Sequence, residues 1–251
     1  MYEQLCIFFT AVMFFTRIPY PKWMDYSEVR LNKSAMYFPL VGCLVGATAA
    51  FIFVLGLFIF PKSVALLLSM IASVIFTGAF HEDGWADVCD GFGGGWNKQD
   101  ILRIMKDSRI GVYGTIGLIV ILALKFVALY EMEMELVPWA LIAGHSMSRF
   151  VSTSFLYTHS YVRENEDSRA KPLATRISWQ GLAVAAFFGI TPVLLLGNAV
   201  YFFVIVPLVI CKWCMGKYFV KWIGGYTGDC LGAAQQVPEV LFYLFIILIS
   251  W

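Results

Sequence analysis

Residues 36–60 have the sequence MYFPLVGCLVGATAAFIFVLGLFIF, which contains no charged side chain. A helix needs about 20 consecutive apolar residues to cross the hydrocarbon core of a bilayer, so this stretch predicts a transmembrane helix. The composition of the 251-residue chain agrees, because 60% of it is hydrophobic and only 14% is charged. A soluble domain carries about 25% charged residues. The sequence therefore predicts an all-α, polytopic integral membrane protein.

Further apolar stretches follow along the chain. We expect about seven transmembrane helices, at residues 36–60, 63–80, 110–130, 137–157, 178–196, 198–215 and 237–251. Residues 5–15 are apolar but too short to span, and Pro19 and Pro21 follow them, which predicts a short N-terminal interfacial or re-entrant helix. The chain contains no stretch with the composition of a linker and no internal repeat, so residues 1–251 are expected to form a single membrane-embedded domain.

The distribution of positive charge predicts how the helices are oriented. Four longer polar connections, at residues 16–35, 81–109, 158–177 and 216–236, fall on one side of the membrane. With Lys212 counted beside the last of them, that side holds fifteen of the 18 lysine and arginine residues. Lysine and arginine gather on the cytoplasmic side, so these connections and any active site in them are expected to face the cytoplasm. The net charge of +1 gives no indication of nucleic-acid binding.

An acidic cluster lies in the second connection, where residues 81–91 have the sequence HEDGWADVCDG. If this stretch continues the helix of the second span, Asp83, Asp87 and Asp90 are spaced i, i+4 and i+7 and share one face. Carboxylates beside a bilayer are costly, and Mg²⁺, which prefers oxygen ligands, would neutralise their mutual repulsion. The cluster therefore predicts a magnesium site, with a solvated loop carrying incidental acids as the alternative.

Two neighbours of these aspartates are further candidates. Glu82 is a candidate metal ligand or hydrogen-bond acceptor. His81 is a candidate general acid or base, or a hydrogen-bonding group at a helix end.

Glycines and cations follow the acidic cluster. Gly93 and Gly94 could let backbone N–H groups approach a phosphate, although a flexible hinge is an equal alternative. Lys106 and Arg109 are candidate phosphate-binding groups, and Asp107 could orient one of them or bind a metal. Cations that merely anchor the end of a transmembrane helix are the alternative.

Charged residues within or beside the spans form the last group of candidates. Arg149 is a candidate substrate-binding residue, with snorkelling to the membrane surface as the alternative. For Lys125, snorkelling is the expected behaviour. Asp229, which lies among glycines, is a candidate for contact with a metal or a substrate hydroxyl, and Glu239 is a weaker one.

Three motifs and the start of the chain carry a resemblance to a known family. The start of the chain contains FTRIP at 15–19. The three motifs are HEDGWADVCDG at 81–91, MKDSRIGVYG at 105–114 and GYTGDCLGA at 225–233. In order and spacing they resemble the cobalamin synthase family, the adenosylcobinamide-GDP ribazoletransferases of the bacterial inner membrane and of archaea. The resemblance covers nearly the whole chain.

The resemblance implies a Mg²⁺-dependent transfer at the end of cobalamin assembly. Adenosylcobinamide-GDP is the implied donor, and α-ribazole or its 5′-phosphate is the implied acceptor, attacking through its ribose 3′-hydroxyl. GMP leaves, and adenosylcobalamin or its 5′-phosphate forms. The lipid bilayer is the other implied partner, nucleic acid is not expected, and assembly into a homo-oligomer is left open.

The predicted residues fit such a reaction. The transfer of a phosphoryl-linked group depends on positioning and charge neutralisation. Mg²⁺ held by Asp83, Asp87 and Asp90 would bridge the diphosphate. Lys106 and Arg109 would bind its non-bridging oxygens, while one of the acids or His81 would take the proton of the attacking hydroxyl.

Two other classes of membrane protein are alternatives. A CDP-alcohol phosphotransferase also has an aspartate-rich helix, but its signature requires arginine after the alanine, where this chain has Asp87 after Ala86. A cation-coupled transporter would place acids near the middle of the bilayer and would show repeat symmetry.

Overall fold

The computed structural model describes residues 2–19, 21, 27–162 and 174–250. Within them the fold is helical, and the isolated bridge between Tyr161 and Tyr226 is the only β-type pairing. The chain begins with α1 (Tyr2–Phe15), α2 (Glu28–Ser34), the 3-10 helix η1 (Ala35–Tyr37), α3 (Phe38–Leu57) and α4 (Lys62–Thr77). It continues with α5 (Phe80–Gly94), α6 (Lys98–Ile104), α7 (Val112–Glu131), α8 (Val137–Thr158) and α9 (Trp179–Ile190). The last elements are η2 (Thr191–Leu196), η3 (Ala199–Val204), α10 (Ile205–Ile223) and α11 (Gly228–Ser250). The all-α prediction is confirmed.

Each of the seven predicted spans corresponds to a helical segment, but not all of them are equally apolar. In the described residues, five segments are long and apolar enough to cross a membrane, and a sixth is added if the bent pair α4–α5 is one span. Helix α8 has 22 residues but is not among them, because polar residues such as His145 and Arg149 lie within it. Seven is therefore an approximate count, and the chain is a multi-pass membrane protein.

Helix α8 lies inside the bundle, where small residues allow close packing. A Cβ on Gly42 of α3 would lie 2.4 Å from the His145 carbonyl oxygen, and one on Gly46 would lie 2.5 Å from the Leu141 oxygen. Lipid tails are as apolar as leucine, so helices in a membrane associate through such close packing and through interhelical hydrogen bonds rather than by leaving water. The polar groups of α8 are consequently buried against other helices.

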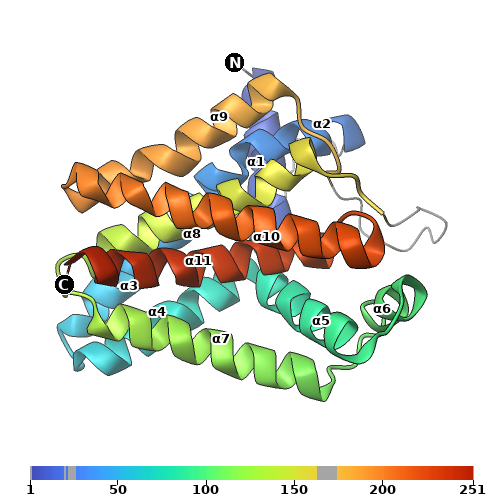
Figure 1. Cartoon of the computed structure of the whole chain (residues 1–251). Helices are drawn as coiled ribbons and strands as arrows, with labels where there is room; N and C mark the ends of the chain where they lie inside the picture. The colour runs from blue at the N-terminus through green and yellow to red at the C-terminus, as the bar shows by residue number, and fades with distance from the viewer. Residues whose placement is uncertain (1, 20, 22–26, 163–173, 251) are drawn as a thin grey trace.

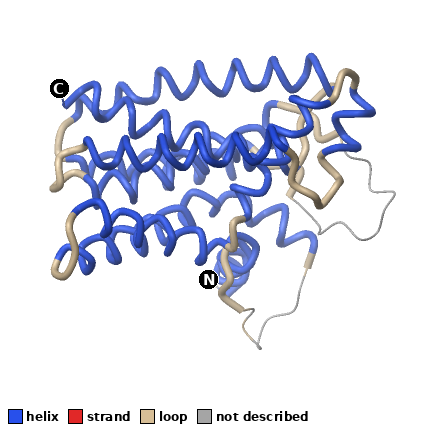
Figure 2. Tube along the Cα trace, turned by 90° about the horizontal axis from the view of Figure 1, so that it is seen from below, coloured by secondary structure: helices blue, strands red, loops and turns tan. Residues whose placement is uncertain are grey.

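Helix α1 lies across the bundle. Figure 1 shows α1 running across the direction of α7, α10 and α11, and Figure 2, turned by 90°, shows the N-terminal helix nearly end-on. Its buried face, which includes Ala11 and Phe15, packs onto the rest of the protein. The predicted short N-terminal helix is therefore present, and its crosswise direction suits an interfacial position.

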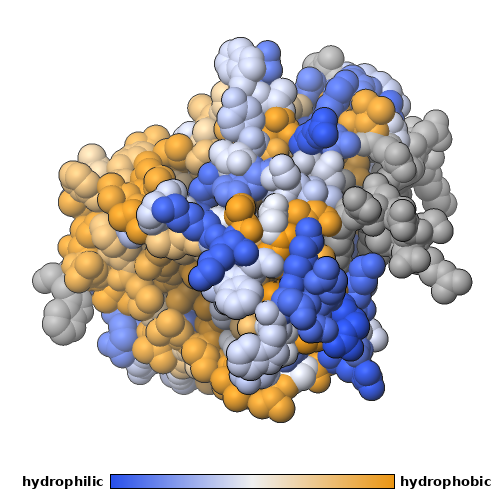
Figure 3. All heavy atoms as spheres, turned by 45° about the vertical axis from the view of Figure 1, so that its right-hand side comes forward, coloured by the Kyte–Doolittle hydropathy of each residue, from blue (hydrophilic) through white to orange (hydrophobic). Residues whose placement is uncertain are grey.

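The four long connections meet at one end of the bundle. Asn32 Oδ1 accepts a hydrogen bond from the Thr175 N–H at 3.0 Å, and the Tyr226 hydroxyl donates to the Thr175 oxygen at 3.0 Å. Lys98 Nζ lies 3.6 Å from the position that a Cβ on Gly224 would occupy. Helix α6 therefore lies beside the turn between α10 and α11. We call this the polar end; it comprises residues 80–111, 159–162, 174–178 and 223–229. Figure 1 shows the C-terminus at the opposite end, and Figure 3 shows polar side chains gathered at the polar end beside a broad apolar surface.

Candidate functional site

A sharp break between α4 and α5 positions the acidic cluster. Gly78 and Ala79 have left-handed backbones, with φ of 69° and 58°, and α5 leaves at 89° to α4. Residues 81–91 are helical, so Asp83, Asp87 and Asp90 do share a helix face, but they lie on a separate helix and not on a straight continuation of the second span. Ala79 is the one non-glycine residue with positive φ in the described chain. Such a conformation costs about 1–2 kcal/mol, and local strain of this kind clusters at functional sites.

The segment after α1 holds this break in place. The Arg17 N–H donates to the Phe76 oxygen at 2.8 Å. A Cβ on Gly78 would lie 2.2 Å from Arg17 Nε, so a larger residue would collide with the guanidinium as well as adopt a strained φ.

The three predicted magnesium ligands share one face of α5 but differ in their surroundings. At about 100° per residue, Asp83, Asp87 and Asp90 fall within a sector of about 60°. Asp83 is exposed, Asp87 is half-buried and Asp90 is buried. In the described residues, no three His, Cys, Asp or Glu side chains are placed to hold one metal ion. The predicted magnesium site of Asp83, Asp87 and Asp90 stays a prediction, and the three carboxylates differ in how accessible they are to an ion.

Asp90 has a structural partner instead. One of its oxygens accepts from the Gly111 N–H at 2.7 Å and the other from the Gly114 N–H at 2.8 Å. These two glycines begin α7, where backbone N–H groups lack partners within the helix and favour a negative charge. A Cβ on either glycine would lie 2.4 Å from the Asp90 carboxylate. Asp90 thus fastens the start of α7 to α5.

Close contact between α5 and α11 brings Asp229 to the acidic helix. A Cβ on Gly84 would lie 3.0 Å from the Asp229 oxygen, and one on Gly232 would lie 3.0 Å from the Gly84 Cα. Asp229 is the second residue of α11 and is half-buried. The motif at residues 225–233 therefore meets the motif at residues 81–91, because both helices carry glycine where their backbones cross.

The α6–α7 connection contains the predicted cations. Arg109 binds the Asp107 carboxylate through Nε at 3.1 Å and through Nη2 at 2.8 Å. Hydrogen bonds from Arg109 lower the pKa of Asp107 to about 2. Arg109 itself is 86% exposed, so it can exchange this partner for a phosphate. Asp107 orients a cation, which was one of its two predicted roles. Lys106, immediately before Asp107, is exposed.

Gly93 and Gly94 are the last two residues of α5. In the last turn of an α-helix the N–H groups donate to carbonyls four residues earlier, so they do not face an anion. A Cβ on Gly93 would lie 2.6 Å from the Tyr113 ring. The structure gives Gly93 a packing role, and the phosphate contact of Gly93 and Gly94 stays a prediction.

His81 lies on another side of α5. It is about 160° around the helix from Asp83, it is 4% exposed, and its ring stacks on Phe15 at 5.5 Å. The residues around it include Ser152 of α8 and Gly228 of α11. His81 therefore does not face the same space as Asp83.

Glu82 and Arg149 point into the interior of the bundle. Glu82 Oε1 accepts from Gln236 Nε2 at 3.0 Å, and Arg149 Nη1 donates to the His145 oxygen at 2.9 Å. Arg149 is 2% exposed, so it does not snorkel to the surface. Four buried polar atoms of the described residues have no hydrogen-bond partner, namely Glu82 Oε2, His145 Nε2, Arg149 Nε and Gln236 Oε1.

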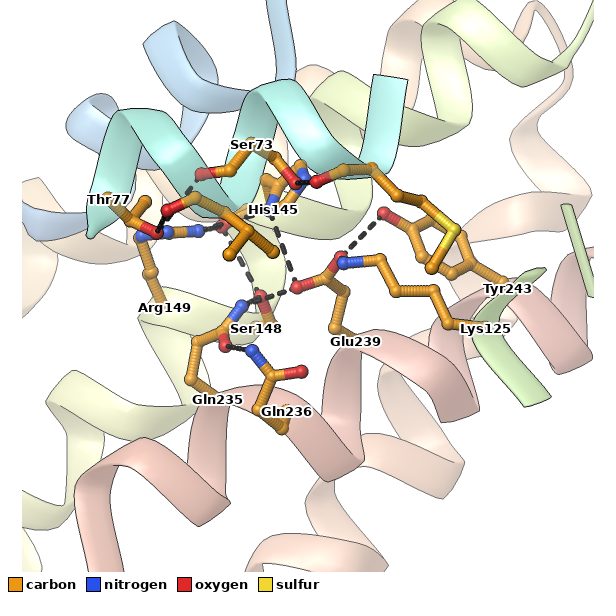
Figure 4. Close-up of polar contacts among 12 residues, drawn as sticks. Ser73, Thr77, Lys125, His145, Ser148, Arg149, Gln235, Gln236, Glu239 and Tyr243 are labelled. Atoms are coloured by element: carbon orange, nitrogen blue, oxygen red, sulfur yellow. Dashed lines mark hydrogen bonds and ion pairs between the residues drawn. The ribbon is translucent and has the colours of Figure 1, made fainter. Parts of the chain in front are cut away.

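A buried ion pair lies beside this group (Figure 4). Lys125 of α7 contacts the Glu239 carboxylate of α11, and the two side chains are 3% and 0% exposed. Glu239 also faces His145 Nδ1 at 3.3 Å, and it accepts from Tyr243 at 3.0 Å and from Gln235 at 2.5 Å. The prediction that Lys125 snorkels is therefore wrong. Two opposite charges in separate apolar stretches were the signal in the sequence that could have predicted the pair.

The fold and this site define a multi-pass helical membrane protein whose polar end combines an acidic helix face with a basic connection. The family described as Cobalamin-5-phosphate synthase matches residues 7–247, and the chain belongs to this family.

Curated relatives agree with the family match. An adenosylcobinamide-GDP ribazoletransferase of Shewanella frigidimarina is 46% identical over 251 residues, covering 99% of this chain and 96% of its own. Proteins of the same name from Shewanella amazonensis and Ralstonia pickettii are 45% and 47% identical. They cover 98% and 92% of this chain, and 96% and 91% of their own lengths. No solved structure matches the chain.

Proposed function

We propose that this protein is an adenosylcobinamide-GDP ribazoletransferase. It transfers the cobinamide phosphate of adenosylcobinamide-GDP to α-ribazole or its 5′-phosphate. The acceptor oxygen forms a bond to the phosphorus on the cobinamide side, the phosphoanhydride bond breaks, and GMP leaves. The observation that carries this proposal is the family match over residues 7–247, which includes all three motifs at the polar end.

The meeting of those motifs supports the proposal. Helix α5 crosses the start of α11 at the Gly84–Gly232 contact, and Asp90 on its acidic face ties it to the start of α7 directly after the basic connection. A diphosphate placed there would meet carboxylates and cations from three parts of the chain. Transfers of this type depend on such positioning and on charge neutralisation.

The donor set of α5 is suited to Mg²⁺. Magnesium is commonly held by one or two carboxylates together with substrate phosphates, so Asp83 and Asp87 are sufficient protein ligands. Asp83 is exposed and Asp87 is half-buried, and the Asp229 backbone contacts α5 at Gly84, the residue after Asp83. When bound, the ion would neutralise charge on the diphosphate and on the departing GMP.

The remaining residues bind and orient the substrates. Arg109 and Lys106 bind non-bridging phosphate oxygens. In the absence of the donor, the Asp107 carboxylate pairs with the Arg109 guanidinium and keeps it oriented. Asp229 receives the acceptor hydroxyl. We assign the proton acceptor to one of the carboxylates, because His81 lies on the other side of α5 and stacks on Phe15.

The polar end is assigned to the cytoplasm, and the membrane to the bacterial inner membrane. Fifteen of the 18 lysine and arginine residues lie in or beside the four connections that meet there. This is the asymmetry that positive residues show in inner-membrane proteins.

The test is a transfer assay with the full chain in phospholipid vesicles. Adenosylcobinamide-GDP, α-ribazole and Mg²⁺ are added, and GMP and the cobalamin product are measured together. Equal amounts of the two products are expected. GMP without cobalamin, or no reaction with either form of the acceptor, would contradict the proposal.

Two variants test the metal site separately. Asp83→Asn and Asp87→Asn are expected to lower the transfer rate at least about 100-fold, because each removes a charged ligand. Asp100→Asn is the matched control, since Asp100 is paired with Arg103 on α6. Full activity in Asp83→Asn would exclude the two-carboxylate site while leaving the family assignment intact.

A further inference from the structure

A groove runs along the outer side of α10. It has a volume of about 700 Å³, and its walls include His159, Val209, Trp213, Gly216 and Val220. A Cβ on Gly216 would lie 2.5 Å from His159 Nε2, so the glycine makes room for the imidazole in the groove wall. Figure 1 shows α10 on the outside of the bundle, and only 22% of an apolar 18-residue window within residues 199–223 is buried. The groove is thus open to the surroundings of the protein.

Among the residues that the structure describes, three lysines and no acidic residue line the same groove. They are Lys212, Lys217 and Lys221, and α10 contains no aspartate or glutamate. Burial, and then the Lys212 ammonium, lower the pKa of His159. The imidazole is therefore uncharged at neutral pH, and the lysines carry the positive charge. A ligand of this groove must be anionic where it meets them.

Aromatic residues place the groove at the level of the lipid headgroups. Trp213 is 57% exposed and Tyr218 is 45% exposed, and tryptophan and tyrosine concentrate at membrane–water interfaces. Lys217 Nζ lies 3.8 Å above the Trp213 ring, and Lys221 Nζ lies 5.7 Å from the Trp222 ring. The apolar part of the groove, at Val209 and Val220, completes an amphipathic surface.

We infer that this groove binds an anionic phospholipid of the surrounding membrane. The lysines that line the groove attract the lipid phosphate, and an acyl chain lies against the apolar wall at Val209 and Val220. Basic pockets on transmembrane helices at the cytoplasmic surface bind anionic headgroups in this way. The occupant is a lipid and not the diphosphate substrate, because the groove faces outward and continues into an apolar surface.

The groove is also separate from the proposed active site. Tyr218 packs against Phe92 of α5 at 5.0 Å. It lies about 140° around α10 from Trp213, which lines the groove. The inference is therefore independent of the proposed function and is tested by a different measurement.

The test uses the full chain in phosphatidylcholine vesicles that contain a trace of spin-labelled lipid. The immobilised fraction of spin-labelled phosphatidylglycerol is compared with that of spin-labelled phosphatidylcholine. We expect the protein to prefer phosphatidylglycerol. The triple variant Lys212→Gln/Lys217→Gln/Lys221→Gln is expected to lose at least about fivefold of this selectivity, the effect of one lysine near an anionic lipid surface.

A matched control removes the same number of positive charges elsewhere on the protein. Lys33→Gln/Lys98→Gln/Arg103→Gln changes three exposed cations outside the groove and is expected to keep the selectivity. Equal losses in both triple variants, or no loss in either, would overturn the inference. If the groove variant does not fold, as judged by circular dichroism, the exposed single substitution Lys217→Gln takes its place and must still lower the selectivity.

A second arm distinguishes lipid from free phosphate. GDP and inorganic phosphate are added to the vesicles with labelled phosphatidylglycerol, and the immobilised fraction is expected to stay constant. Displacement by GDP, but not by potassium chloride at equal ionic strength, would show that the groove belongs to the substrate and would overturn the assignment to lipid.

Discussion

Replacing Lys125 with methionine is expected to destabilise the protein strongly. Lys125 and Glu239 are 3% and 0% exposed, so neither charge is screened by water. At about 3 Å and an effective dielectric constant of about 20, their attraction is about 5 kcal/mol. Glu239 would keep its contacts with His145 Nδ1, Tyr243 and Gln235. It would still be left as an uncompensated buried charge, which costs about 3–5 kcal/mol.

A double-mutant cycle isolates this contribution. Lys125→Met and Glu239→Gln are each expected to lower the free energy of unfolding by about 3–5 kcal/mol, since each leaves one charge unpaired. The double variant removes both charges and is expected to lose only about 1–3 kcal/mol, far less than the sum.

The unfolding free energies can be measured in dodecyl maltoside micelles titrated with sodium dodecyl sulfate. Helix content by circular dichroism and tryptophan emission would both be followed, so that a single cooperative transition can be verified. Losses that add to within about 0.5 kcal/mol would refute the reasoning, because uncoupled sites are additive.

Three further predictions concern the polar end. Gly84→Ala places a Cβ 3.0 Å from the Asp229 backbone and is expected to reduce the rate of GMP release at least about tenfold by forcing α5 from α11. Gly94→Ala, which meets only the Ile104 side chain at 3.4 Å, should leave that rate unchanged; equal rates in both variants would contradict the crossing argument. Asp90→Asn is expected to lower the unfolding free energy by about 1.5–3 kcal/mol, because its carboxylate accepts two backbone N–H groups. The Mg²⁺ concentration for half-maximal transfer should not change in that variant, and a large increase would restore Asp90 as a ligand. The Arg109 hydrogen bonds depress the pKa of Asp107 to about 2, so the pair persists at neutral pH and is lost only as pH falls through that value. The acid limb of the pH–rate profile should therefore be the same in Asp107→Asn, and a shifted limb would contradict this assignment.

The sequence was sufficient to predict the helical class and the approximate spans. Apolar length and the position of lysine and arginine are properties of the chain itself, because a bilayer imposes them on each helix separately. The same holds for the periodicity of residues 81–91, which does form a helix. The last helix, predicted from residue 237, begins at Gly228, because Gly228, Asp229 and Gly232 interrupt the apolar pattern used to find it.

The individual roles of the acidic residues were less accessible to sequence analysis. Asp83, Asp87 and Asp90 share one face of α5, yet it is the Asp90 carboxylate that accepts hydrogen bonds from the backbone N–H groups at the start of α7. His81 and Glu82 adjoin Asp83 in the chain but face other helices. Helical periodicity shows which side chains share a face of one helix, but it does not show which other helix that face will contact.

Apolar length and charge asymmetry therefore determined that this chain forms a membrane bundle with its polar connections together, since each helix meets the same bilayer. Only the tertiary structure decided which charges are paired and which remain available. Lys125 and Glu239 are far apart in the chain and meet because α7 and α11 pack together. The break at Gly78 and Ala79 turns the acidic helix by 89°, and that turn is set by contacts with Arg17 and α11 as well as by the local sequence. Pairing and helix direction depend on three-dimensional contacts between distant segments, which no periodicity within one segment encodes.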